Sequence, residues 1–141
     1  MVSVNMYNLS TEGNLKVANN FRVKEFKSDS SKVVIHPELP EALQIIRDEI
    51  KKAVNLTNAY RTDSHNKRVG GATNSYHTYG MAADIYVNGY TPIELAKFIS
   101  SLFKDKYCII AYPKKGIVHF DVRKKKYWAV NNGKETPVNN F

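Results

Sequence analysis

The chain has 141 residues, of which 43% are hydrophobic and 11% aromatic, so it can bury the core of one compact domain. No apolar run approaches the roughly 20 residues of a membrane span, and the N-terminus lacks the basic and apolar regions of a secretory signal. The single cysteine, Cys108, excludes an internal disulfide. A formal charge of +8 favours an anionic partner without naming it. We expect a soluble monomer.

An N-terminal arm and an amphipathic helix come first. Residues 1–20 are polar with weak periodicity, which indicates an arm packed on the domain. A short strand is expected over residues 33–35, and Pro37 suits the first position of a helix. Apolar residues then recur at helical spacing, namely Leu39, Leu43, Ile46 and Ile50. The spacing predicts a helix over residues 37–53.

A strand, a long loop and a second strand are expected next. Residues 54–60 suit a strand that carries Arg61 at its end. The polar segment 62–79 predicts a long loop, a feature that is usually functional or mobile. Residues 82–87 predict a strand in which Asp84 lies on the face opposite Ile85.

The C-terminal half predicts one helix and a hairpin. Thr91 and Glu94 form a capping box with a proline between them, which predicts a helix over residues 92–103. Residues 107–112 and 117–123 predict two hairpin strands, in which His119 and Asp121 share one face. Residues 131–141 predict an irregular polar tail. These elements indicate an α+β single domain.

His77, Asp84 and His119 are candidate metal ligands. Two imidazoles and one carboxylate suit zinc, and three protein ligands leave one coordination position for a water molecule. Gly80 and Ala82 would let the backbone approach the metal closely. The sequence therefore predicts a hydrolytic zinc centre.

A longer pattern surrounds these ligands. Its members are Phe21-Arg22-Val23-Lys24-Glu25-Phe26, Tyr60-Arg61-Thr62, Asn66, Val69-Gly70-Gly71-Ala72, Asn74-Ser75, His77, Gly80, Ala82-Ala83-Asp84-Ile85, Tyr112-Pro113, Val118-His119-Phe120-Asp121-Val122-Arg123 and Trp128. In this order they resemble the M15 zinc peptidases, and more narrowly the small bacterial and phage branch of that family. The resemblance covers about residues 20–128.

The resemblance implies a Hedgehog/D-Ala-D-Ala-peptidase fold, in which helices flank an antiparallel sheet. It implies a zinc peptidase domain over residues 21–130, with an arm before it and a tail over residues 131–141. By position, the zinc ligands would be His77, Asp84 and His119. Arg61 would face the substrate and hold an oxyanion or a carboxylate. Other expected substrate contacts are Ser75, Tyr79 and Tyr112.

The sequence offers one candidate for the catalytic base. Several family members carry an acidic residue three positions before the last histidine ligand, where this chain has Gly116. Asp121 is the nearest acidic candidate, because residues 119 and 121 project from the same strand face. Two roles are open for Asp121: general base, or a carboxylate that orients a histidine ligand.

The resemblance implies hydrolysis of a peptide bond in bacterial peptidoglycan, as a D,D-carboxypeptidase or an endopeptidase. The alternative is a catalytically impaired, zinc-containing wall-binding module of the same fold. Anionic wall polymers are possible partners for the basic chain. A nucleic-acid binder is disfavoured, because no basic helix stripe and no aromatic platform accompany the lysines. Without a signal, we expect synthesis in the cytoplasm and action at the wall after release, or as part of a larger particle.

Overall fold

A computed structural model describes residues 4–72 and 75–141 of the chain. Asn74, part of the family pattern, lies outside the described residues. The helices are α1 (Leu9–Glu12), η1 (Val23–Phe26), α2 (Glu38–Ile50), α3 (Asp63–Arg68), η2 (Tyr76–Tyr79) and α4 (Pro92–Phe103), where η marks a 3-10 helix. The strands are β1 (Asn5–Asn8), β2 (Lys16–Ala18), β3 (Phe21–Arg22), β4 (Lys32–Ile35), β5 (Asn55–Asn58), β6 (Ala82–Tyr86), β7 (Cys108–Tyr112), β8 (Ile117–Asp121), β9 (Tyr127–Asn131) and β10 (Glu135–Pro137).

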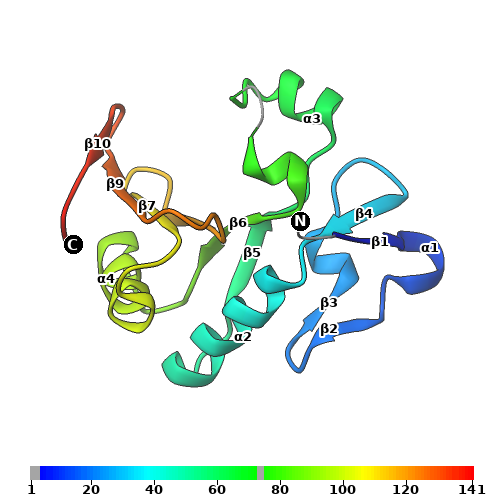
Figure 1. The fold of residues 1–141 in the computed structure, drawn as a ribbon, viewed down its shortest axis with the longest axis horizontal. Coiled ribbons are helices and arrows are strands. Elements are labelled where there is room, and N and C mark those ends of the chain that lie inside the picture. The colour runs from blue at the N-terminus through cyan, green and yellow to red at the C-terminus, as the bar shows by residue number, and fades with distance from the viewer. Residues whose placement is uncertain (1–3, 73–74) are drawn as a thin grey trace.

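A six-stranded sheet in the order β10-β9-β7-β8-β6-β5 organises the domain (Figure 1). The expected antiparallel sheet is wrong in one respect, because β7 and β9 pair in parallel and the sheet is mixed. The short connection after β8 passes the beginning of β7 and starts β9 on the other side of that strand. The alternation of apolar and polar residues predicts which face of a strand is buried, but it does not predict the order of the strands in the sheet. The parallel pair was therefore not expected from the sequence.

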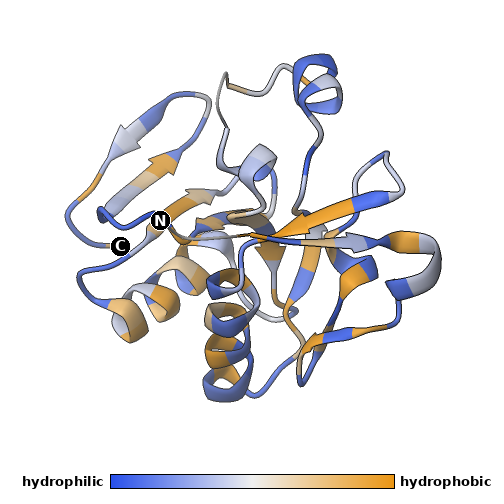
Figure 2. Ribbon diagram, turned by 45° about the vertical axis from the view of Figure 1, so that its right-hand side comes forward, coloured by the Kyte–Doolittle hydropathy of each residue, from blue (hydrophilic) through white to orange (hydrophobic). Residues whose placement is uncertain are grey.

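The two long helices pack on one side of the sheet (Figure 1). Their apolar positions are buried together with alternate strand residues, and Figure 2 shows hydrophobic colour along the sides that face inward. The fully buried side chains include Leu43, Ile46, Ile85, Ile99 and Phe120. Asp84 and His119 lie on strands whose other face belongs to this core, so their side chains point away from it.

The predicted helices and the hairpin are confirmed. The capping box at the start of α4 is present, and β7 and β8 pair directly over residues 108–112 and 117–121. The long loop predicted over residues 62–79 was only partly right, since it holds α3 and η2. The side chain of Thr62 accepts a hydrogen bond from the backbone nitrogen of His65 at 3.2 Å and begins α3. Helices of 6 and 4 residues are too short to show a repeating apolar pattern in the sequence.

Both terminal segments contribute strands. β1 pairs with β4, and β2 pairs with β3. In the tail, which was expected to be irregular, β10 pairs with β9 and the ring of Phe141 lies 5.7 Å from the ring of Trp128 between centroids. Among the described residues there is no helix long and apolar enough to cross a membrane.

Candidate metal centre

Adjacent strands place two of the three candidate ligands. Asp84 of β6 and His119 of β8 are directly opposed in the antiparallel register. His77 comes from η2, which lies against β6. The side chain of Ser75 accepts a hydrogen bond from the backbone nitrogen of His77 at 3.2 Å and begins this short helix. The position of His77 against the sheet is thereby fixed by η2.

The side chains of His77, Asp84 and His119 converge on one point. Nε2 of His77 lies 3.4 Å from Oδ1 of Asp84, and Nδ1 of His119 lies 3.2 Å from the same oxygen. All three ligand atoms are within 4.8 Å of one another. Two ligands held at about 2.0–2.1 Å by one tetrahedral ion lie about 3.3–3.4 Å apart. The observed separations therefore fit three ligands of a single small ion.

Each histidine has its second ring nitrogen engaged. Nδ1 of His77 lies 2.7 Å from the backbone oxygen of Ala59, a contact in which the ring nitrogen donates. Nε2 of His119 lies 2.7 Å from Oδ2 of Asp121. Such outer contacts fix the tautomer and the ring plane of a metal-binding histidine. The remaining ring nitrogen of each histidine, Nε2 of His77 and Nδ1 of His119, faces Asp84.

Asp121 is a fully buried anion held by one arginine. Nε of Arg123 donates to Oδ1 of Asp121 at 2.8 Å, and Nη2 donates to Oδ2 at 2.7 Å. Burial raises the pKa of Asp121, but the hydrogen bonds from Arg123 and His119 outweigh it and hold that pKa well below its usual range. Asp121 is thus ionised and lies behind His119, on the side of the ring away from Asp84.

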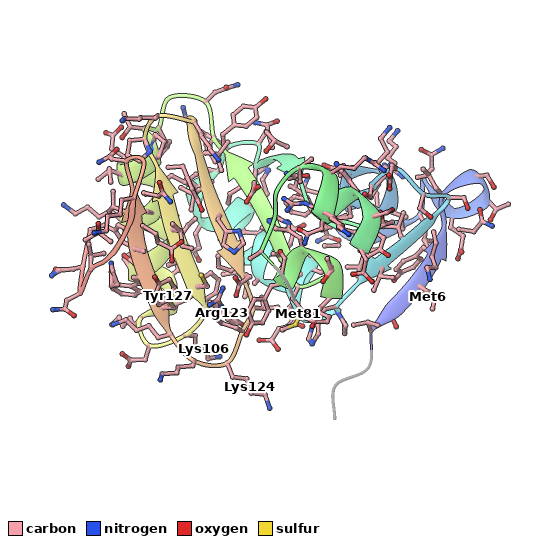
Figure 3. All side chains as sticks on the ribbon, turned by 90° about the horizontal axis from the view of Figure 1, so that it is seen from above. Met6, Met81, Lys106, Arg123, Lys124 and Tyr127 are labelled. Atoms are coloured by element: carbon pink, nitrogen blue, oxygen red, sulfur yellow. The ribbon has the colours of Figure 1, made fainter. Side chains whose placement is uncertain are left out.

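Two tyrosines fix the position of Arg123. Its guanidinium carbon lies 4.3 Å from the ring centroid of Tyr76 and 5.6 Å from that of Tyr127, and Figure 3 shows Arg123 beside Tyr127. Tyr76 precedes His77 on η2, whereas Tyr127 begins β9. Arg123 therefore links the two candidate histidine ligands indirectly: it contacts Asp121 behind His119 and Tyr76 of the helix that carries His77.

A cleft of about 850 Å³ opens over the three ligands. Its lining includes Arg61, Ser75 and Tyr112, all expected to contact substrate. Tyr79, expected in the same role, is 45% exposed and lines a separate, smaller pocket with Met81 and other residues. The structure thus brings three of the four expected contact residues to the ligands.

Arg61 is buried beside the cleft with donors to spare. One terminal nitrogen donates to Oδ1 of Asn66 at 2.8 Å, while the buried Nε makes no hydrogen bond to any described residue. A Cβ on Gly71 would lie 2.7 Å from Nη1 of Arg61 and 2.0 Å from Oδ1 of Asn66. The glycine therefore permits a close packing that orients the guanidinium.

Four residues with a part in this geometry had no role assigned from the sequence: Asn58, Ala59, Asn66 and Arg123. Asn58 donates to Oδ2 of Asp84 at 3.4 Å, while Ala59 acts through its backbone oxygen, which no side-chain pattern can reveal. The sequence did contain a signal for the role of Arg123. It lies two residues after Asp121, and at the end of a strand an arginine at this spacing can make two hydrogen bonds to the carboxylate.

Cys108 belongs to a second candidate group. Its sulfur, one ring nitrogen of His119 and one oxygen of Asp121 also lie within 4.8 Å of one another. Cys108 and Asp121 are both fully buried, and neither lines the cleft that opens over His77, Asp84 and His119. Asp121 is in addition already engaged by Arg123. The group His77, Asp84 and His119 is therefore the better metal site.

Comparison with known proteins agrees with this geometry. The peptidase M15 family model matches residues 14–121. The chain belongs to the peptidase M15 family. The match covers most of the chain and includes His77, Asp84, His119 and Asp121. M15 peptidases are metal-dependent, and a group able to hold a metal is present. No match was found among curated proteins.

Gly80 ends η2, the short helix that carries the candidate ligand His77, and its packing can be tested by unfolding. Its φ is +70°, and a Cβ would lie 2.4 Å from the backbone oxygen of Val34. We expect Gly80→Ala to reduce the free energy of unfolding by more than the roughly 1–2 kcal/mol of a left-handed conformation alone. Gly116 has a φ of +71° and open space around it, so Gly116→Ala isolates the conformational cost. Equal losses in urea unfolding would refute the proposed close contact.

The pH dependence of metal binding follows from His119. Burial lowers its pKa, but hydrogen bonds to Asp121 and Asp84 outweigh burial and raise that pKa well above 6.5. The metal-free protein gains stability from protonated His119 below the ordinary pKa and loses it as the pH rises through the folded pKa. A metal bound through His119 must displace this proton, so we expect its apparent affinity to fall up to about tenfold per pH unit as the pH drops.

Calorimetry in buffers of different ionisation enthalpy measures this effect directly. We expect metal binding near pH 7 to release a proton from the site. Zero net proton release, with affinity independent of pH, would show that His119 is neutral in the metal-free protein.

Proposed function

We propose that this chain is a zinc-dependent peptidase that cleaves a peptide bond in bacterial peptidoglycan. The observation that carries the proposal is the convergence of His77, Asp84 and His119 under an open cleft, with the far nitrogen of each histidine already engaged. Nitrogen and oxygen ligands at this spacing suit zinc. Peptide-bond hydrolysis is the reaction expected of a member of the peptidase M15 family. The bond cleaved would lie in a stem peptide or a cross-bridge.

The bound zinc would supply Lewis acidity and an activated water for hydrolysis. Ala59 and Asp121 hold the two histidine rings in the tautomers that leave Nε2 of His77 and Nδ1 of His119 for the metal. Arg61 presents buried donors at the cleft, where charge develops on a carbonyl oxygen or where a substrate carboxylate sits. Ser75 and Tyr112 line the same cleft as substrate contacts.

We assign Asp121 the orienting role rather than that of general base. Its side chain is fully buried, both oxygens bond to Arg123, and one also bonds to His119. A general base must reach the proton that it removes within about 2.6–3.2 Å. Asp121 is not among the described residues that line the cleft.

One observation favours a second candidate function. Among the described residues lining the cleft, Asp84 is the only carboxylate, and it is committed to the metal group. A site without a dedicated base could bind metal and wall peptides while turning over slowly. The second candidate is therefore a wall-binding module of the same family that has weak activity.

Mass spectrometry of peptidoglycan fragments separates the two candidates. Purified bacterial walls are incubated with the zinc-loaded protein and with His77→Ala. New stem-peptide or cross-bridge termini in the first digest only would support the peptidase and assign the bond. Stoichiometric zinc with no new termini would favour the binding module. Cleavage by both proteins would contradict a role for the metal group.

A further inference from the structure

The positive charge of this protein is concentrated in one part of the chain. Residues 104–134 carry nine lysines and arginines and two aspartates, a net charge of +7 out of +8 for the whole chain. The other 110 residues together carry a net charge of only +1. A charge excess confined to the strands β7, β8 and β9 and their turns is a local surface feature rather than a general property of the protein.

The parallel pairing of β7 and β9 gathers these lysines. Two turns precede these strands, and because the strands run side by side in the same direction, the turns end at the same edge of the sheet. The backbone nitrogen of Tyr127 donates to the backbone oxygen of Tyr107 at 3.1 Å, which joins the turns. Figure 3 shows Lys106 and Lys124 on the same side of the molecule. We call this group the lysine edge: Lys104, Lys106, Lys124, Lys125 and Lys126.

The opposite ends of the same strands carry a second group. Lys114 and Lys115 lie in the turn between β7 and β8, and Lys134 lies in the turn after β9. A Cβ on Gly133 would lie 3.8 Å from Nζ of Lys114, so these two turns are close together. Five-residue strands separate the two groups by about 17 Å, at about 3.3 Å per residue. An extended polyanion can contact both groups, whereas a small anion cannot.

These cations are not neutralised within the protein. None of the ion pairs formed by the described residues involves a lysine. Asp105 is the one acidic residue between these lysines in the sequence, and Glu38, which lines a small pocket with Lys124, accepts a hydrogen bond from Tyr107 instead of forming an ion pair with a lysine. All five lysines of the edge are exposed. A polyanion that binds there would therefore replace counterions rather than break existing pairs.

Aromatic rings near these cations are in contact with lysines of the protein itself. Nζ of Lys126 lies 3.8 Å from the ring centroid of Trp128, and Nζ of Lys115 lies 5.0 Å from that of Tyr112. Nucleic-acid surfaces of single-strand type use open aromatic faces on which bases stack. Rings that already contact a lysine favour a polymer with charge and no bases.

We propose that the lysine edge binds a linear phosphate polymer of the bacterial cell wall and holds the cleft against its substrate. Lys115 of the second group lines the cleft, and so does Arg123, which directly precedes Lys124 of the lysine edge in the chain. Both basic groups therefore border the site. The inference rests on the proposed wall substrate, but it concerns binding through a surface outside the metal group.

Binding to a polymer without peptide bonds tests the surface apart from hydrolysis. The probe is purified poly(glycerol phosphate), titrated into the zinc-loaded protein in low salt. The variant is Lys124→Gln, Lys125→Gln, Lys126→Gln, and the matched control is Lys24→Gln, Lys27→Gln, Lys32→Gln. Both remove three exposed charges, but the control residues lie in the segment from η1 to β4, far from β9 in Figure 1.

We expect the variant to bind the polymer at least about tenfold more weakly and with a smaller salt dependence, while the control stays within about twofold of wild type. Cleavage of walls stripped of phosphate polymers should be the same for all three proteins. Equal losses in variant and control would show that net charge, not this surface, drives binding. Tighter binding of wild type to duplex DNA at equal phosphate concentration would overturn the choice of partner.

Discussion

Replacing His77 with alanine is expected to abolish metal binding and peptide hydrolysis together. The change removes one of three ligands, and the loss should exceed the roughly 10–100-fold drop in metal affinity that follows loss of an outer contact. It also leaves the buried oxygen of Ala59 without its donor, which costs about 1–3 kcal/mol of stability. Metal content by mass spectrometry and turnover on purified walls measure the two effects.

His65→Ala is the matched control for this change. His65 lies in α3, half-buried, with Nδ1 2.8 Å from the side-chain oxygen of Ser28 and outside the metal group. We expect it to keep one zinc per chain and turnover within a few-fold of wild type. A His77→Ala protein that folds, contains no metal and digests walls at the normal rate would refute the metal mechanism.

Asp121→Asn is expected to lower metal affinity by about 10–100-fold, because the amide cannot hold the His119 ring as the carboxylate does. The same change leaves Arg123 without a charged partner. Breaking a buried ion pair costs about 3–5 kcal/mol, and the Arg123 side chain is 24% exposed, so the lower end applies. Isothermal titration with zinc and urea unfolding give the two values.

Arg123→Lys tests whether the two hydrogen bonds from Arg123 to Asp121, and not its charge alone, are needed to orient the His119 ring. Lysine keeps the charge beside Asp121 but cannot make the two parallel hydrogen bonds that arginine makes. We expect an intermediate zinc affinity for it, between wild type and Asp121→Asn. If Asp121→Asn instead retains full zinc affinity and loses only turnover, Asp121 is the base and its assigned orienting role is wrong.

Much of the fold was readable in the sequence because its signals are local. The capping box at Thr91 and the apolar spacing from Leu39 to Ile50 both describe contacts within one helix, and the structure contains both helices. Alternation also placed His119 and Asp121 on one strand face, and their side chains are bonded to each other. These features depend on residues a few positions apart.

The features that escaped sequence reasoning depend on distant segments. The parallel pairing of β7 with β9 is set by how the chain passes around β7, and no residue pattern in β9 encodes its direction. The backbone oxygen of Ala59 behind His77 has no signature at all. The choice between two roles for Asp121 needed the position of Arg123, because one carboxylate on the right face could serve either purpose.

His77, Asp84 and His119 are proposed to hold the metal, and X-ray absorption at the zinc edge tests this assignment most directly. The two candidate groups share His119, but only one of them contains the sulfur of Cys108. We expect a shell of nitrogen and oxygen ligands alone, at about 2.0–2.1 Å from zinc. A sulfur ligand at about 2.3 Å would place the metal at Cys108 and contradict the assignment.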